Sequence, residues 1–203
     1  MTRVHRPATY LIVLAAVTGA ALIGRLGVAL EGVDGEAAAA ARYTARYSFY
    51  WFVAAWSASA LARLWPGGWR AQLLFRRRAI GLGFAAAHGV HFLAVLAVLL
   101  GPGYKADLPV LIGGGVGYVF VAAMALTSNN AAVRALGIGR WKLLHATGGY
   151  VLAFIFAFTY YGGLSAKPLA AAPALALIGI AAMLRAAAWA KGRFAARAKP
   201  GPA

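Results

Sequence analysis

Long apolar runs separated by short basic or polar connections dominate the pattern of the chain. Crossing a hydrocarbon core of about 30 Å takes roughly 20 helical residues. Six runs approach or reach that length, at approximately Ala8–Leu30, Tyr47–Trp65, Ala79–Leu100, Leu108–Leu126, Leu143–Tyr161 and Leu169–Ala190. The pattern therefore predicts an all-α integral membrane protein built as a six-transmembrane-helix bundle.

The charges in the connections predict how this bundle is oriented. With the N-terminus inside, the inner segments carry 15 of the 20 basic residues. The outer segments carry the other five, together with the four acidic residues Glu31, Asp34, Glu36 and Asp107. Because Lys and Arg accumulate on the cytoplasmic side of membrane proteins, both termini are predicted to be cytoplasmic.

Composition narrows the classes of partner and of chemistry. Hydrophobic residues make up 63% of the 203 residues, which indicates that the lipid bilayer is the main partner. The formal net charge is +16, but the basic residues lie in the connections between apolar runs. They therefore indicate the orientation of the helices in the membrane and not nucleic-acid binding. Cysteine is absent, which excludes disulfides, thiolate metal sites and iron–sulfur clusters. Redox chemistry would therefore require a bound cofactor.

The lengths of the connections predict a single transmembrane domain over residues 1–190. The longest outer connection, Glu31–Arg46, is too short for a nucleotide-binding domain, so no flavin or NAD site is expected in this chain. Residues 191–203 form a basic tail with two prolines, predicted to be disordered in the cytoplasm. Glycines 113, 114, 115 and 117 in the fourth run are predicted to let neighbouring helices approach closely.

Histidines are the candidate functional residues, because ionisable side chains deep in membrane helices usually face the bundle interior and have a function. His88 and His91 are three apart, which places them on nearly one helix face, whereas His145 lies just inside the fifth run. Neutral imidazole is a common axial ligand of heme iron. Core histidines bonded to Ser, Thr or backbone groups are the alternative. His5 precedes the first run and is given no role.

Three segments resemble the ferric reductase-like transmembrane domain family, and especially its short bacterial members. The first reads Arg76-Arg77-Arg78-Ala79-Ile80-Gly81-Leu82 and is followed by His91-Phe92. The second joins Leu126-Thr127-Ser128 to Gly139-Arg140-Trp141-Lys142-Leu143-Leu144-His145, and the weaker third is Arg42-Tyr43-Thr44. Together they span about residues 42–162 in the order expected for the family.

The resemblance implies b-type heme, at most one, between the third and fifth helices, with His88, His91 and His145 as candidate axial ligands and Arg77 near a propionate. The family's second histidine in the fifth helix would fall at position 158, where this chain has Phe158. His91 and His145 are also offset by about 15 Å, and His88 and His145 by about 10 Å, at 1.5 Å per residue. Three arrangements stay open: a heme on His91 or His88 with an unusual or absent second ligand, an inner heme on His145, or no heme.

The function that the resemblance implies is transmembrane electron transfer by a heme-b-binding protein in the bacterial inner (plasma) membrane. Such a protein is an oxidoreductase component that takes electrons from a cytoplasmic flavoprotein or a quinol and passes them outward to iron or a periplasmic acceptor. The alternative is a heme-free accessory or structural membrane subunit, which the phenylalanine at position 158 favours.

Overall fold

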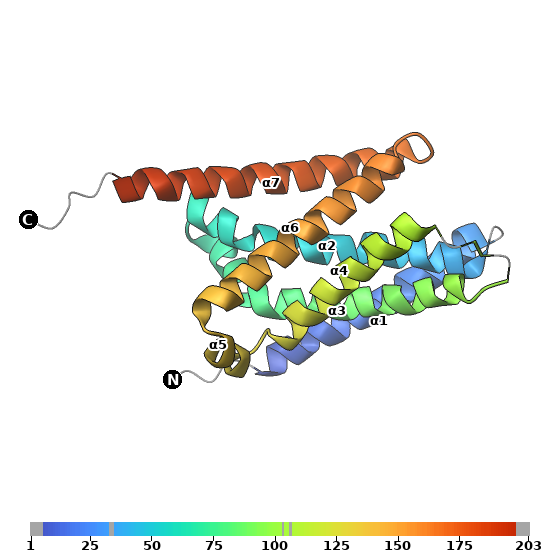
Figure 1. Cartoon of the computed structure of the whole chain (residues 1–203), viewed down its shortest axis with the longest axis horizontal. Helices are drawn as coiled ribbons and strands as arrows, with labels where there is room; N and C mark the ends of the chain where they lie inside the picture. Colours follow the sequence, from blue (N-terminus) through green and yellow to red (C-terminus); the bar gives the residue numbers. More distant parts are fainter. Residues whose placement is uncertain (1–5, 33–34, 103, 106, 198–203) are drawn as a thin grey trace, which may run out of the picture. The chain divides into compact units, whose positions relative to one another are not determined.

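The computed structural model describes residues 6–32, 35–102, 104–105 and 107–197, so His5 and the last residues of the predicted tail lie outside the described part. Within it the chain forms seven α-helices and no strand (Figure 1). The all-α prediction is thus confirmed. The helices are α1 (Arg6–Glu31), α2 (Glu36–Leu64), α3 (Gly68–Leu99), α4 (Leu108–Leu126), α5 (Asn130–Leu136), α6 (Ile138–Gly162) and α7 (Pro168–Arg197).

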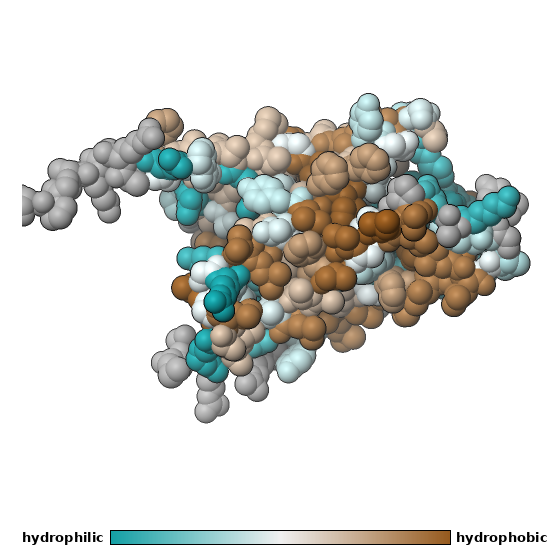
Figure 2. All heavy atoms as spheres, viewed as in Figure 1, coloured by the Kyte–Doolittle hydropathy of each residue, from teal (hydrophilic) through white to brown (hydrophobic). Residues whose placement is uncertain are grey.

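Four of the described helices are long and apolar enough to cross a membrane, namely α1, α3, α6 and α7. A fifth candidate is the pair α4 and α5, whose axes are bent by 104° across a short break. Figure 2 shows apolar side chains along much of the face in view, with polar residues gathered mainly toward the helix ends. These apolar helices indicate a multi-pass membrane protein.

Most helices extend beyond the apolar runs that predicted them. α2 begins at Glu36 and not at Tyr47, because the alanine-rich stretch Ala37–Ala41 favours helix, and the long outer connection is mostly helical. α3 begins at Gly68, eleven residues before the predicted start. An apolar run marks only the residues that can lie in the hydrocarbon core, whereas the backbone hydrogen bonds of the helix continue into the polar residues beside it. α7 likewise continues through Lys191, the predicted start of the tail, to Arg197.

The described chain divides into two compact units. The first comprises Met1–Phe52 and Arg78–Phe156, and the second Val53–Arg77 and Ala157–Ala203. In the first unit α1 and α2 run antiparallel and approach closely, since a Cβ on Gly27 would lie 2.6 Å from Cγ of Tyr43. A core of small residues, Ala16, Ala20 and Ala87, joins α1 to α3. Close contact between these helices therefore depends on residues that lack bulk.

The glycines of α4 behave differently from the prediction. Among them only Gly117 has a packed neighbour, with Cδ1 of Ile155 3.2 Å from where a Cβ would lie. A Cβ on Gly113, Gly114 or Gly115 would meet no other atom of the described residues within 4 Å. The prediction of close packing was therefore wrong for these three positions, because a run of small residues does not reveal which side of a helix faces a partner.

Candidate functional site

His88 and His91 form the centre of the candidate site, on α3 within the first unit. His88 is 9% exposed, His91 is half-buried, and their ring centroids lie 4.9 Å apart. The predicted pairing of these two side chains on one helix face is borne out. Aromatic rings surround His88: Phe84 at 5.2 Å, Tyr118 of α4 at 5.0 Å and Phe156 of α6 at 5.9 Å between centroids.

Two buried hydroxyl groups of α2 hold these imidazoles. Ser48 Oγ lies 2.9 Å from Nδ1 of His88, and Thr44 Oγ1 lies 3.3 Å from Nδ1 of His91. Ser48 and Thr44 are 0% and 2% exposed, so water does not compete for either contact. Both contacts join α2 to α3, and hydrogen bonds between polar side chains stabilise the association of membrane helices.

The tautomers of both histidines follow from the bonds that the hydroxyls make. Thr44 Oγ1 donates to the carbonyl of Ala40 at 2.7 Å, and Ser48 Oγ donates to that of Ala45 at 2.9 Å. Because a hydroxyl has one proton to donate, we infer that each oxygen accepts from the Nδ1–H of its histidine. In the neutral imidazole Nε2 then carries the lone pair. Metal-bound histidines have the same arrangement, in which the nitrogen that does not bind the metal donates its N–H to a neighbouring polar group.

His145 has a different environment at the start of α6. Its Nε2 lies 3.1 Å from Oγ1 of Thr127, the residue that caps α4, and its ring lies 4.3 Å from that of Trp141. Thr127 Oγ1 donates to the carbonyl of Ala123 at 2.7 Å, so His145 donates from Nε2. The Trp141 indole donates to the carbonyl of Thr127 at 2.9 Å, which completes a polar junction between α4 and α6.

The structure does not bring His145 to the α3 histidines. Phe156 is the α6 residue that packs on His88, and it lies eleven residues beyond His145. At 1.5 Å per residue, the two α6 positions are about 16 Å apart along the helix axis. His145 and His88 therefore cannot ligate opposite faces of one heme iron in this packing. Phe158, at the position expected for a second histidine, is 69% exposed.

The remaining predicted site residue, Arg77, belongs to the second unit. Its Nε donates to the carbonyl of Ala55 on α2 at 3.1 Å. Its role toward a propionate stays a prediction, because the histidines belong to the first unit.

The residues fit one axial ligand of a heme better than two. The free Nε2 lone pairs of His88 and His91 suit iron, but both lie on one helix and so approach from the same side. The hydroxyl of Tyr118, whose ring stacks at 29° on that of His91, is a buried polar atom without a hydrogen-bond partner in the described structure. It is the polar group on α4 that faces this cluster.

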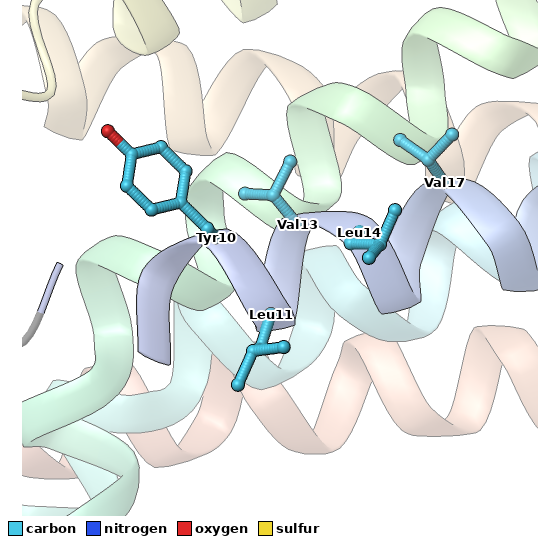
Figure 3. A pocket seen from close by; sticks show the side chains of 5 residues that line it. All are labelled: Tyr10, Leu11, Val13, Leu14 and Val17. Atoms are coloured by element: carbon cyan, nitrogen blue, oxygen red, sulfur yellow. The ribbon is translucent and has the colours of Figure 1, made fainter. Parts of the chain in front are cut away.

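The structure also shows an apolar depression of about 670 Å³ along the outer side of α1, lined by Tyr10, Leu11, Val13, Leu14 and Val17 (Figure 3). Tyr10, Leu11 and Leu14 are more than half exposed, as residues facing lipid would be. Tyr10 is its single polar side chain among four aliphatic ones, so the histidine cluster is the stronger candidate site.

Sequence reasoning missed Thr44, Ser48, Tyr118 and Phe156. The signal that was present is the spacing of Thr44 and Ser48, which are one helical turn apart, like His88 and His91. Two polar pairs on otherwise apolar helices indicate facing stripes that bond to each other. Comparison with protein-family models, with curated proteins and with solved structures finds no match.

Proposed function

We propose that this chain is a multi-pass membrane protein that binds one b-type heme on α3, through His88 or His91, and transfers electrons across the bacterial inner membrane. The single observation that supports it best is the anchoring of both Nδ1–H groups by Ser48 and Thr44, which presents two Nε2 lone pairs inside an aromatic cluster. Buried imidazoles held in this tautomer are suited to iron.

The chain's own residues would position and shield such a group. Ser48 and Thr44 fix the orientation of the two rings, and the rings of Phe84, Tyr118 and Phe156 exclude water from His88. A bound heme would supply one-electron chemistry that the side chains of this cysteine-free protein lack. Arg77 is the candidate partner of a propionate. The donor would be a cytoplasmic flavoprotein or a quinol, and the acceptor would be periplasmic.

Six membrane spans with both termini in the cytoplasm belong to the same proposal. α2 and α4 would be the two further spans, since their 29 and 19 residues reach across most or all of a hydrocarbon core. Phe49, Phe52, Val53 and Trp56 of α2 are buried, whereas Tyr50 is 59% exposed, so one side of this helix packs against protein. The bias of basic residues toward the inner connections supports the orientation.

A heme-free accessory or structural subunit is the second candidate, and a specific observation favours it. The α6 residue that packs on His88 is Phe156, and the histidines already have hydroxyl partners, as core histidines would. In a heme-free subunit, the Ser48–His88 and Thr44–His91 contacts would determine how α2 and α3 associate. Loss of a histidine would then weaken the fold or partner binding without removing any cofactor.

The absorption spectrum of protein purified from heme-replete membranes tests the proposal. We expect a Soret band that is lost in the double variant His88→Ala/His91→Ala. His145→Ala is the matched control and should keep the band, because His145 lies about 16 Å along α6 from the level of His88. A folded protein without a Soret band would leave the heme-free function standing. A band that is lost only with His145 would move the heme to the inner junction and contradict the α3 site.

A further inference from the structure

The second unit carries an unbalanced positive charge. Its sequence, Val53–Arg77 and Ala157–Ala203, contains no Asp or Glu, since all four acidic residues belong to the first unit. It contains seven arginines and three lysines: Arg63, Arg70, Arg76, Arg77, Arg185, Arg193, Arg197, Lys167, Lys191 and Lys199. No carboxylate side chain within this unit can therefore neutralise any of its cations.

Arg185 lies within the apolar run of α7, Arg77 lies directly before the apolar run of α3, and both donate to neighbouring carbonyls of α2. Arg77 of α3 donates from Nε to the carbonyl of Ala55 at 3.1 Å, and Arg185 of α7 donates from Nη1 to that of Trp56 at 2.9 Å. The Arg185 guanidinium also lies 4.8 Å from the ring centroid of Trp56. Both arginines are half-buried, and their charges repel each other. The guanidinium groups of α3 and α7 thus both bind to adjacent backbone carbonyls of α2.

Further along the same interface, α2 and α7 exchange cationic contacts in both directions. Lys191 Nζ lies 3.2 Å from the carbonyls of Arg63 and Leu64 at the end of α2. Arg63 in turn donates from Nη1 to the carbonyl of Ala188 at 3.4 Å. The basic side chains therefore continue from the Arg77 and Arg185 pair to the end of α2, where the chain leaves the apolar run.

Backbone carbonyls satisfy individual N–H groups but do not cancel charge. Arg77 and Arg185 therefore each keep a positive charge while they donate to these carbonyls. Holding two like charges close together in a medium of low dielectric is costly unless an anion joins them. An anion bound beside both guanidinium groups would offset this repulsion.

We propose that the guanidinium groups of Arg77 and Arg185 bind the phosphate group of an anionic phospholipid between α2, α3 and α7. The planar guanidinium fork matches phosphate oxygens in a bidentate manner, which lysine does not. Anionic lipid is also present at high concentration around any membrane helix, and basic sites between helices bind such headgroups. Arg77 is also the candidate partner of a heme propionate, so the lipid and the heme would compete for this side chain.

Lipid titration of the purified protein in neutral detergent tests this site. The probes are short-chain phosphatidylglycerol, phosphatidylcholine with the same chains and inorganic phosphate, with bound lipid counted by native mass spectrometry. We expect phosphatidylglycerol to bind more tightly than phosphatidylcholine. Arg77→Gln and Arg185→Gln should each weaken its binding about five-fold, the factor that corresponds to about 1 kcal/mol per basic residue.

Arg193→Gln is the matched control. Arg193 lies on α7 over the ring of Trp189 at 5.0 Å, and its loss should leave phosphatidylglycerol affinity unchanged. The variant Arg77→Lys/Arg185→Lys keeps both charges but lacks the guanidinium fork, so it should bind phosphatidylglycerol more weakly than wild type and more tightly than phosphatidylcholine, and it tests the site if the Gln variants fail to fold. Competition by inorganic phosphate would assign recognition to the phosphate alone, and its failure to compete would assign it to the intact lipid; both support the site.

Two results would overturn the proposal. One is wild-type protein that binds phosphatidylglycerol no better than phosphatidylcholine, whichever variants fold. The other is phosphatidylglycerol binding that disappears when heme is bound, because the two guanidinium groups would then belong to heme propionates. Equal lipid binding by protein from heme-depleted and heme-replete cells would support it, and the Soret band reports the heme proposal separately.

Discussion

Removing the Ser48 hydroxyl tests the central contact of the histidine cluster. Ser48→Ala leaves the Nδ1–H of His88 without its acceptor at 2.9 Å, in a place where Ser48 is 0% and His88 9% exposed. A buried donor left unpaired costs about 1–3 kcal/mol in soluble proteins. Hydrogen bonds between membrane helices measured by double-mutant cycles average about 0.6 and reach about 1.7 kcal/mol. We therefore expect a loss of about 1–1.7 kcal/mol in unfolding free energy.

The assay is reversible unfolding of heme-free protein in mixed micelles, followed by circular dichroism. A cycle of Ser48→Ala, His88→Phe and the double variant isolates the pair, and its coupling energy should lie at about 0.6–1.7 kcal/mol. Ser57→Ala is the matched control, since Ser57 is also buried on α2 but makes no described bond to a histidine. A coupling energy below about 0.3 kcal/mol would refute the reasoning, because that is the level at which independent sites add.

The assigned tautomer provides an independent measurement on the same pair. Nitrogen-15 NMR of histidine-labelled, heme-free protein should show His88 and His91 protonated on Nδ1 and unprotonated on Nε2, since both hydroxyls donate elsewhere. His145 should show the opposite tautomer, with its proton on Nε2 facing Thr127. Finding the proton of His88 or His91 on Nε2 would remove the observation on which the heme proposal depends most.

Two smaller predictions concern packing and surface charge in the first unit. Gly27→Ala should lower the unfolding free energy by about 1–3 kcal/mol, because the new Cβ would lie 2.6 Å from Cγ of Tyr43. Gly114→Ala should raise the unfolding free energy by a few tenths up to about 1 kcal/mol, because alanine has the higher helix propensity and the new Cβ would meet no described atom within 4 Å. Unfolding in mixed micelles checks both, and equal effects would contradict the packing. Glu31→Gln breaks the 3.1 Å ion pair with Arg42, which is about one-third exposed, so the cost should stay below about 1 kcal/mol and shrink in high salt.

Sequence alone predicted the helices where apolar length and helix length coincide. Leu108–Leu126 was predicted to the residue, because Pro109 favours a helix start and the polar residues from Thr127 end the apolar run. The predicted starts of α2 and α3 were wrong, because both helices begin in polar or alanine-rich sequence. The hydropathy of a segment indicates whether lipid or water surrounds it, whereas the ends of a helix depend on local helix propensity and capping.

The candidate site was predicted in part for a similar reason. The spacing of His88 and His91 is local, so one helix face could be inferred from sequence. Their partners Ser48 and Thr44 lie 40 and 47 residues away, and which faces of two apolar helices meet is decided by packing. The close approach of α1 to α2 depends on small residues of α1 such as Gly27, and the resemblance does not cover α1. The relation to ferric reductase-like domains stays a prediction.

The helical phase of α6 sharpens the question of the second ligand. Residues 156 and 158 differ by about 200° around the helix, so they point to opposite sides. Phe156 meets His88 at 5.9 Å between ring centroids, whereas Phe158 is 69% exposed. A histidine introduced at 156 should therefore convert a heme held by one α3 imidazole into a bis-histidine, low-spin heme, and one introduced at 158 should not. Comparing the spectra of Phe156→His and Phe158→His decides between these outcomes. If only Phe158→His produced the low-spin form, α6 would have to rotate when heme binds, and Phe158 itself would mark the ligand position that this chain has lost.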